Sequence, residues 1–319
     1  MNLYEYSLGT KRTGMFAIIG IVIVIASILG GYLMEKGNVL VLLQPSELLI
    51  IGGAGLGTLL IANPLPILKG IISNLLLILK GSPYNEKAYS EALNMLNELF
   101  QVARREGPAK LEEHIEEPAK SSIFKKYPTF ANDHFAVDYV CDTLRMSLAG
   151  SVTPFDLDML METDAEVHHH ESGMPAAALA TVADSLPGLG IVAAVLGVVI
   201  TMSALGGPPE EIGHKVAAAL VGTFLGILMC YGFVGPLAAN VTKINDEANA
   251  YYRVLRQGVV GYLKGMPPLL AAESARRTVP VQVRPSMKEM EAAFKQAKAA
   301  PGAKGASEAK DAAGLKGAA

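Results

Sequence analysis

Four long runs without a formal charge dominate the pattern of apolar and polar positions along the chain. They cover residues 13–34, 48–68, 185–209 and 216–242. About 20 residues are enough for a helix to cross the hydrocarbon core of a bilayer, so every run is long enough to span a membrane. The pattern predicts an all-α integral membrane protein with four transmembrane helices.

The segment between the second and third runs is polar and has helical periodicity. Apolar residues recur at intervals of three and four between Tyr89 and Ala103, and a second such set runs from Phe135 to Leu148. This spacing gives each helix one buried face and one wet face. We therefore expect a large helical loop between the second and third transmembrane helices. Its last helix either continues into the third span without a break or bends at Pro175.

The segment after the fourth run is polar as well. It predicts one helix over residues 246–263 and another after Pro285, where Ser286 and Glu289 fit a capping box. The end of the chain lacks the apolar residues that a core requires. The expected organisation is a cytoplasmic leader at 1–12, transmembrane helices 1 and 2 in 13–68, a cytoplasmic helical domain at 69–175, transmembrane helices 3 and 4 in 176–242, cytoplasmic C-terminal helices at 243–298 and a disordered tail at 299–319.

Basic residues near the ends of the runs predict the orientation, because Lys and Arg are retained on the cytoplasmic side. The two short connections inside the hairpins hold only Lys36 and Lys215. Both termini and the middle segment are therefore expected in the cytoplasm. The basic residues that flank the runs on that side are Lys11, Arg12, Lys69, Lys80, Lys243, Arg253 and Arg256.

The composition is typical of a membrane protein, and the charge argues against one class of partner. Hydrophobic residues make up 51% of the chain and charged residues 18%. The formal net charge of −3, without a basic patch among aromatic residues, argues against binding to nucleic acid. Two cysteines give no disulfide framework.

Ionisable residues are absent from the centres of the four runs. Glu47 lies at the outer edge of the second run and Asp184 at the cytoplasmic edge of the third. Both are interpreted as interfacial carboxylates within reach of water. An ion pathway through lipid normally needs an ionisable group inside the membrane. If the protein conducts an ion, the titrating carboxylate should therefore come from another chain.

The third and fourth runs form a hairpin, the second of the chain, and each of them carries a proline near its cytoplasmic end. Pro187 lies three residues past Asp184, about 5 Å into the membrane, and Pro236 lies seven before Lys243, about 10 Å in. The two are expected at similar depth. Proline removes a backbone donor and kinks a helix, so the pair is either tolerated without a role or forms a hinge or gate.

Small residues recur four apart in the spans, a spacing that lets helix backbones approach closely in lipid. Either packing within one subunit or a tightly assembled oligomer would explain them. Thr223 adds a hydroxyl in the fourth span, which by itself is weak evidence for a pore. The candidate packing glycines are Gly53, Gly57, Gly190, Gly222 and Gly226.

Other constellations do not favour an enzyme or a metal site. Consecutive histidines at His168–His170 point in different directions on a helix, which favours a solvated helix end over a metal site or pH-responsive patch. The IGGAGLG stretch lies inside a span, not between a strand and a helix. Arg104 and Glu112 bracket a Gly-Pro turn and are either solvated charges or a docking surface that steers a partner.

Taken together, the motifs resemble the A subunit of the bacterial flagellar motor stator, the MotA family, from about Met15 to Met290. They are GGYLM, QPSELLIIGGAGLGT, LEEHIEEP, DSLPGLGIVAAVLGVV, VGTFLGIL, YGFVGPLA and RPSMKEME. The leader, the triple histidine and the alanine-glycine-lysine tail depart from the family pattern.

The resemblance implies a proton-driven torque generator in the bacterial inner membrane, not a classical enzyme. Five A subunits would surround two copies of a single-span B subunit whose membrane aspartate carries the proton. The proline pair matched by Pro187 and Pro236 would couple proton passage to movement of the ring. Positions matched by Arg104 and Glu112 would contact the rotor's switch-complex protein, with a register uncertain by one residue because both charges are doubled. No cofactor is implied besides the coupling proton.

Ion choice follows from two channel-lining positions. Sodium-driven relatives place a threonine seven residues after the first proline, where this chain has Ala194, while the fourth-span threonine is kept as Thr223. A sodium site needs several oxygen ligands, so the loss of one favours protons. Two alternatives remain at this point: a related proton channel that energises outer-membrane transport, which usually has three spans, and a non-conducting membrane scaffold.

Overall fold

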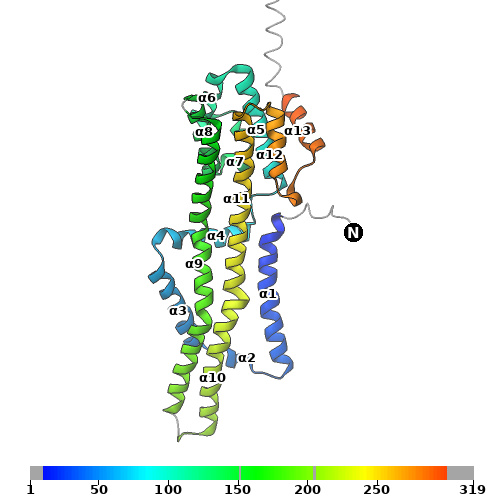
Figure 1. Cartoon of the computed structure of the whole chain (residues 1–319). Helices are drawn as coiled ribbons and strands as arrows, with labels where there is room; N and C mark the ends of the chain where they lie inside the picture. The colour runs from blue at the N-terminus through cyan, green and yellow to red at the C-terminus, as the bar shows by residue number, and fades with distance from the viewer. Residues whose placement is uncertain (1–9, 151, 204–205, 300–319) are drawn as a thin grey trace, which may run out of the picture. The chain divides into compact units, whose positions relative to one another are not determined.

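The computed structural model describes residues 10–150, 152–203 and 206–299, and within these ranges all regular elements are helices (Figure 1). The chain divides into two compact units. Of the described residues, those in 10–82 and 168–247 form one, which we call the membrane unit, and those in 83–167 and 248–299 form the other, the polar unit. The expected leader before Thr10 and the expected tail after Ala299 lie outside the described residues.

The membrane unit contains the apolar helices. Within the described ranges, four helices are long and apolar enough to cross a membrane: Gly14–Met34, Val39–Ala62, Pro154–Met202 and Pro209–Leu263. The fold thus has the predicted four spans. Its elements are α1 (Thr10–Met34), α2 (Val39–Leu42), α3 (Pro45–Ala62), α4 (Leu65–Lys80), the later part of α9 (Pro154–Met202), α10 (Pro209–Leu228), the π-helix η4 (Met229–Val234) and the start of α11 (Gly235–Leu263).

Large apolar side chains stay exposed around these helices. On α1, Phe16 is 58% exposed and Val22 57%, and on α9 Val199 is 62% exposed. An apolar surface of this extent marks contact with lipid or with other subunits. The exposure is therefore consistent with a membrane-embedded unit.

The Asn-Pro-Leu-Pro stretch ends α3 and starts α4. Asn63 is extended (φ −132°, ψ 138°), because the residue before a proline avoids the helical region. Pro66 lies in the first turn of α4, where its missing N–H costs nothing. Gly14 lets α1 approach α4 so closely that a Cβ there would lie 2.2 Å from the Leu79 carbonyl oxygen. Residues 69–82, expected in the cytoplasmic domain, belong to the membrane unit instead.

The polar unit is built from the middle segment and the C-terminal helices together. Its largest buried side chains include Tyr89, Phe100 and Tyr251, which share one core. The predicted amphipathic helices are present as α5 and α8. Its elements are α5 (Glu86–Glu106), α6 (Pro108–Glu116), η2 (Pro118–Lys120), η3 (Phe124–Lys126), α7 (Pro128–Ala131), α8 (His134–Leu148), the start of α9, the end of α11, α12 (Pro268–Thr278), η5 (Val281–Val283) and α13 (Met287–Ala299).

Asp133 joins three segments of the polar unit. Its Oδ1 accepts from the Ala136 amide at 3.1 Å and caps α8. Its Oδ2 accepts from the hydroxyls of Tyr84 at 3.0 Å and Tyr252 at 3.1 Å. One carboxylate therefore ties residues from before α5 and from α11 to the start of α8.

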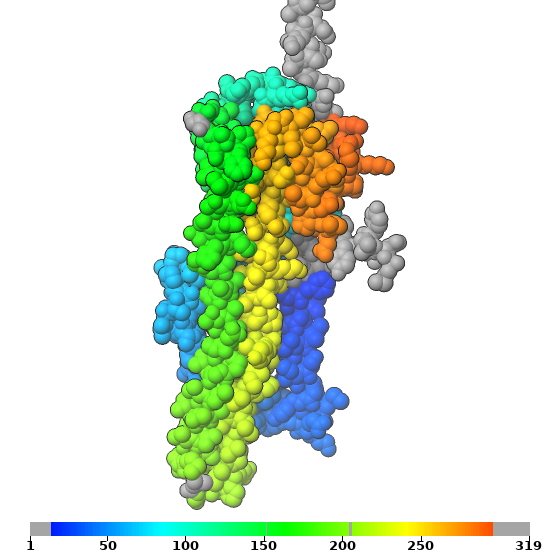
Figure 2. Space-filling model, in the orientation of Figure 1, coloured from blue at the N-terminus to red at the C-terminus, as the bar shows by residue number. Residues whose placement is uncertain are grey.

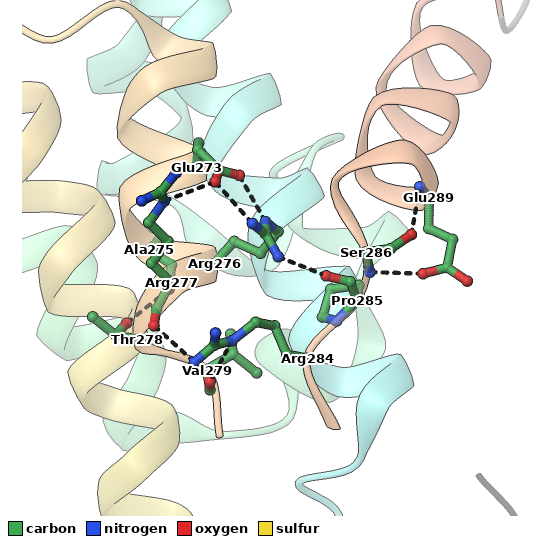
Figure 3. Close-up of polar contacts among 10 residues, drawn as sticks. All are labelled: Glu273, Ala275, Arg276, Arg277, Thr278, Val279, Arg284, Pro285, Ser286 and Glu289. Atoms are coloured by element: carbon green, nitrogen blue, oxygen red, sulfur yellow. Dashed lines mark hydrogen bonds and ion pairs between the residues drawn. The ribbon is translucent and has the colours of Figure 1, made fainter. Parts of the chain in front are cut away.

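An arginine cluster fixes the C-terminal helices (Figure 3). Glu273 accepts from Arg276 Nε at 2.6 Å and from Arg277 Nε at 3.0 Å. The hydrogen bond from Arg276 lowers the pKa of Glu273 to about 2, against the opposing effect of burial. The predicted capping box is confirmed, since the Ser286 amide donates to Glu289 and the Glu289 amide donates to the Ser286 hydroxyl.

The helix that contains the third span begins well before the predicted membrane segment. α9 is one helix of 49 residues that continues through Pro175 and Pro187. At the first of these the ring packs on Gly70 of α4, where a Cβ would lie 2.7 Å from the Pro175 Cγ. The helix thus runs into the third span without a break, which is the first of the two expectations.

Candidate functional site: the hairpin of α9 and α10

Glycines allow α9 and α10 to lie in contact along the second hairpin (Figures 1 and 2). A Cβ on Gly226 would lie 2.6 Å from the Leu186 carbonyl oxygen and 2.8 Å from the Gly190 Cα. A Cβ on Gly190 would in turn lie 2.9 Å from the Gly222 carbonyl oxygen. Such distances leave no room for a side chain, so backbone packs on backbone here.

Ala194 and Thr223, the two expected channel-lining positions, lie about one helical turn further toward the α9–α10 connection. A Cβ on Gly222 would lie 3.2 Å from both the Ala193 Cβ and the Ala194 amide nitrogen. Thr223 directly follows Gly222. Ala194 and Thr223 therefore lie at one level of the hairpin, and both are half-buried.

Thr223 differs from other threonines of the membrane unit. The hydroxyls of Thr201 and Thr242 donate to backbone carbonyls of their own helices, those of Gly197 and Ala238. Within the described part of the chain, no such bond is found for Thr223. Its hydroxyl is thus free to meet a group outside this chain.

Pro236 coincides with a local change of helix type. The six residues Met229–Val234 form a π-helix, and the Gly235 amide donates to the Cys230 carbonyl five residues earlier. Since proline cannot donate, the bond to the residue four before it is lost, and the wider turn takes up the mismatch. A Cβ on Gly235 would lie 2.9 Å from the Cys230 oxygen, so glycine fits this turn best.

The two prolines do not lie at similar depth. Leu186 faces Gly226, and Ser172 Oγ lies 2.5 Å from the Asn245 side-chain oxygen. This antiparallel register sets Pro236 about two helical turns from Pro187, on the order of 10 Å along the axis. The depths expected from sequence were counted from Asp184 and Lys243, and this register shows that these two residues are not level. Pro187 is half-buried and Pro236 exposed.

Among the described residues, side chains added on the GxxxG face of the second span would meet no other helix. A Cβ on Gly57 would meet nothing within 4 Å, and one on Gly53 would meet only Leu49 of its own helix. The close neighbour of α9 is Gly55, where a Cβ would lie 3.4 Å from the Leu186 side chain. Within the described chain the contact with α9 thus runs through Gly55, and packing through Gly53 and Gly57 stays a prediction for contacts with another subunit.

Glu47 of α3 lies against the hairpin, where the sequence did not predict it. It is 5% exposed, and its Oε2 lies 2.7 Å from the position of a Gly222 Cβ. Reading it as an interfacial carboxylate in water was wrong, because α3 begins beside the interior of α10 and not beside its outer end. Only the contact between the two helices reveals this, and the sequence holds no local signal for it.

Arg104 and Glu112 are both exposed, at the end of α5 and on α6 of the polar unit. Neither forms an ion pair within the described residues, whereas the neighbouring Glu113 pairs with Lys110. Burial raises the pKa of Tyr262, and the nearby charge of Arg104 opposes that shift. The two expected contact residues are therefore free to meet a partner.

The histidine cluster is held by a neighbouring helix. The Asn245 amide donates to the His169 carbonyl at 3.2 Å, and Nε2 of His169 lies 3.8 Å from Asp246. No group of three or more potential ligands that would hold a metal ion occurs in the described ranges. His169 thus contributes to packing of α9 on α11.

Comparison with known proteins identifies the family of the chain. Residues 18–107 match the model for the motility protein A N-terminal domain, and residues 134–253 match the model for the MotA/TolQ/ExbB proton channel family. Motility protein A of Salmonella typhimurium is 38% identical over 277 residues, which cover 87% of this chain and 94% of the relative.

Solved structures show the same fold. A chain of the Campylobacter jejuni MotAB structure aligns with a TM-score of 0.70 at 20% identity, covering 86% of this chain and 99% of that one. A chain of the flagellar MotAB stator complex from Bacillus subtilis aligns with a TM-score of 0.64 at 23% identity, covering 84% and 96%. This chain therefore belongs to the motility protein A (MotA) family of flagellar stator subunits, and is a multi-pass protein of the bacterial inner membrane.

Proposed function

We propose that the chain conducts protons together with a single-span B subunit and converts their passage into torque on the flagellar rotor. The observation that carries the proposal is the α9–α10 hairpin of a MotA-family chain. Its inner face is closed by glycine contacts, and its outer face leaves residues such as Ile191 and Val195 exposed at 55% and 57%. An exposed apolar face next to a free hydroxyl at Thr223 suits a partner helix that brings an ionisable group.

The partner assignment is supported by the relatives of known structure, which are complexes of an A and a B chain. The B subunit would supply the aspartate that carries the proton. A pentamer of A subunits around two B subunits is the expected assembly. Both chain ends and the polar unit would face the cytoplasm.

Protons are the expected coupling ion and no other cofactor is needed. At the level of Gly222 one channel-lining position is Ala194, which offers no side-chain oxygen, and Thr223 offers one. Sodium requires several oxygen ligands, whereas a proton passes between single carboxyl and hydroxyl groups. The hairpin is thus better suited to protons.

Contact with the rotor would run through the polar unit. Arg104 and Glu112 are exposed charges of opposite sign without an ion pair in the described chain. Exposed charges of this kind steer and orient a partner more than they bind it. The rotor's switch-complex protein is the expected partner.

The test uses the two prolines of the hairpin. Pro187→Leu and Pro236→Leu should leave membrane assembly with the B subunit intact and abolish swimming. Pro209→Leu is the matched control, since Pro209 is exposed at the first position of α10, where the proline N–H is not needed. Normal swimming of both hairpin variants would contradict the proposal.

A second candidate function is a proton channel that energises outer-membrane transport, because the description of the matching family model names TolQ and ExbB beside MotA. Deletion of the chain would then cause an uptake defect with normal swimming. A non-conducting scaffold is the third possibility, and correct assembly without proton flux would favour it.

A further inference from the structure

One carboxyl oxygen of Glu47, Oε2, is buried in the membrane unit without a hydrogen-bond partner among the described residues. The residue is 5% exposed. A buried charge without a partner is costly, so the site accommodates the neutral carboxylic acid far better than the carboxylate. A group that holds its proton in this way either has no role in transfer or exchanges that proton.

Glu47 lies beside the interior of α10. Oε2 would be 2.7 Å from a Cβ at Gly222, which lies six residues inside the apolar run that starts at Val216. At helical rise this is about 9 Å. A Cβ at 222 would require the Glu47 carboxyl group to move, and it would also press on the Ala193 Cβ and the Ala194 amide nitrogen at 3.2 Å.

The same glycine connects Glu47 to the channel-lining positions. The Ala194 amide nitrogen is 3.2 Å from the same Cβ position, and Thr223 follows in sequence. The carboxyl group is therefore at the level of the hairpin where the partner's acidic group is expected.

The charged groups on the helices around Glu47 do not neutralise it. Lys215 lies two turns outward on α10, and its ammonium group binds Glu211 at 3.0 Å. Asp184 of α9 is exposed at the other end of the span, and α2 carries no titratable group. The remaining titratable residues of α10 are Glu210, Glu211 and His214.

We propose that Glu47 is a proton-binding site of the A subunit that relays protons between the outer side of the membrane and the level of Thr223. The carboxylic acid would give its proton to the partner's carboxylate, leaving a Glu47 carboxylate that takes the next proton from the outer side. This step rests on the proposed proton conduction and adds a protonatable residue of this chain to it.

The test compares two variants of Glu47 in the complete complex with its B subunit, reconstituted in liposomes. Glutamine has the shape of the protonated acid but cannot exchange a proton. Glu47→Gln should therefore copurify with the partner and lower proton flux at least tenfold. Glu35→Gln, at an exposed acid in the connection between α1 and α2, is the control and should conduct as the wild type does. A merely structural role would be preserved by glutamine, so wild-type flux in Glu47→Gln would overturn the proposal.

Glu47→Asp keeps the acid and covers the case in which the glutamine variant does not assemble. It should conduct with a pH profile displaced from that of the wild type, and an unchanged profile would overturn the proposal. Absent flux in the wild-type complex would instead count against proton conduction itself, so the two failures are distinguishable.

Discussion

The carbonyl oxygen of Leu186 lies 2.6 Å from where a Cβ of Gly226 would be, which is the shortest such distance at the described glycines of α9 and α10. The contact lies one residue before Pro187, in the part of α9 whose backbone bonding the proline interrupts. Close packing here holds the helix pair together where one of its helices is weakened.

Gly226→Ala should loosen the hairpin. The added Cβ must displace the backbone of Leu186 or Gly190, which costs about 1–3 kcal/mol in a well-packed interior. We expect a lower thermal unfolding temperature in detergent and reduced swimming. Gly188→Ala is the control, because a Cβ there meets nothing within 4 Å. Equal stability of both variants would contradict the packing described.

Asp133→Ala should destabilise the polar unit by about 2–4 kcal/mol. The change removes the cap of α8 and the carboxylate acceptor that the hydroxyls of Tyr84 and Tyr252 share. Denaturant unfolding of the full chain would measure it. Asp138→Ala, at an exposed position of the same helix, should stay close to the wild type. A cost for Asp133→Ala no larger than for this control would count against the shared carboxylate.

Glu273 predicts a loss of stability in acid. Its pKa is about 2 in the folded chain, below the ordinary value of 4.5, so its contribution is complete above pH 4.5 and is lost as the pH falls toward 2. The contribution is at most about 2–3 kcal/mol. In Glu273→Gln, the unfolding temperature should fall less between pH 5 and pH 3 than in the wild type. The measurement is the unfolding temperature of both proteins at pH values about one unit apart.

The control for this pH series is Glu166→Gln, at an exposed carboxylate. Its unfolding temperature should follow the wild-type pH dependence. If Glu273→Gln lost stability in acid as steeply as the wild type, the arginine cluster in Figure 3 would not be the cause.

Reversing the charge of the proposed rotor contacts tests the register of the doubled charges. Arg104→Glu and Glu112→Lys should each reduce swimming by more than half, because like charges would then face the rotor, with assembly unchanged. Arg105→Glu and Glu113→Lys are the matched neighbours and should have smaller effects, since Glu113 is already paired with Lys110. Larger effects at the neighbours would move the contact by one residue.

The parts of the fold that depend on local pattern were predictable from sequence. The apolar spacing in α5 and α8 and the reciprocal bonds of Ser286 and Glu289 all involve residues within a few turns of one another. The four spans follow from length and apolar composition alone.

The features that the sequence did not predict depend on contacts between helices or on the geometry of the backbone. α9 continues through Pro175, where the ring packs on Gly70 of α4, and no pattern within α9 reveals that contact. The π-helix before Pro236 was not predicted either, because it follows from the geometry of the backbone beside the proline. Glu47 was misplaced because a sequence gives the end of each span but not the offset between neighbouring helices.

Proton flux through the purified complex of this chain and its B subunit is the most direct test of the central claim. Liposomes containing the complex should take up protons in sodium-free buffer, at a rate that added sodium does not raise. Flux that appears only with sodium, or no flux from a correctly assembled complex, would contradict a proton-driven stator.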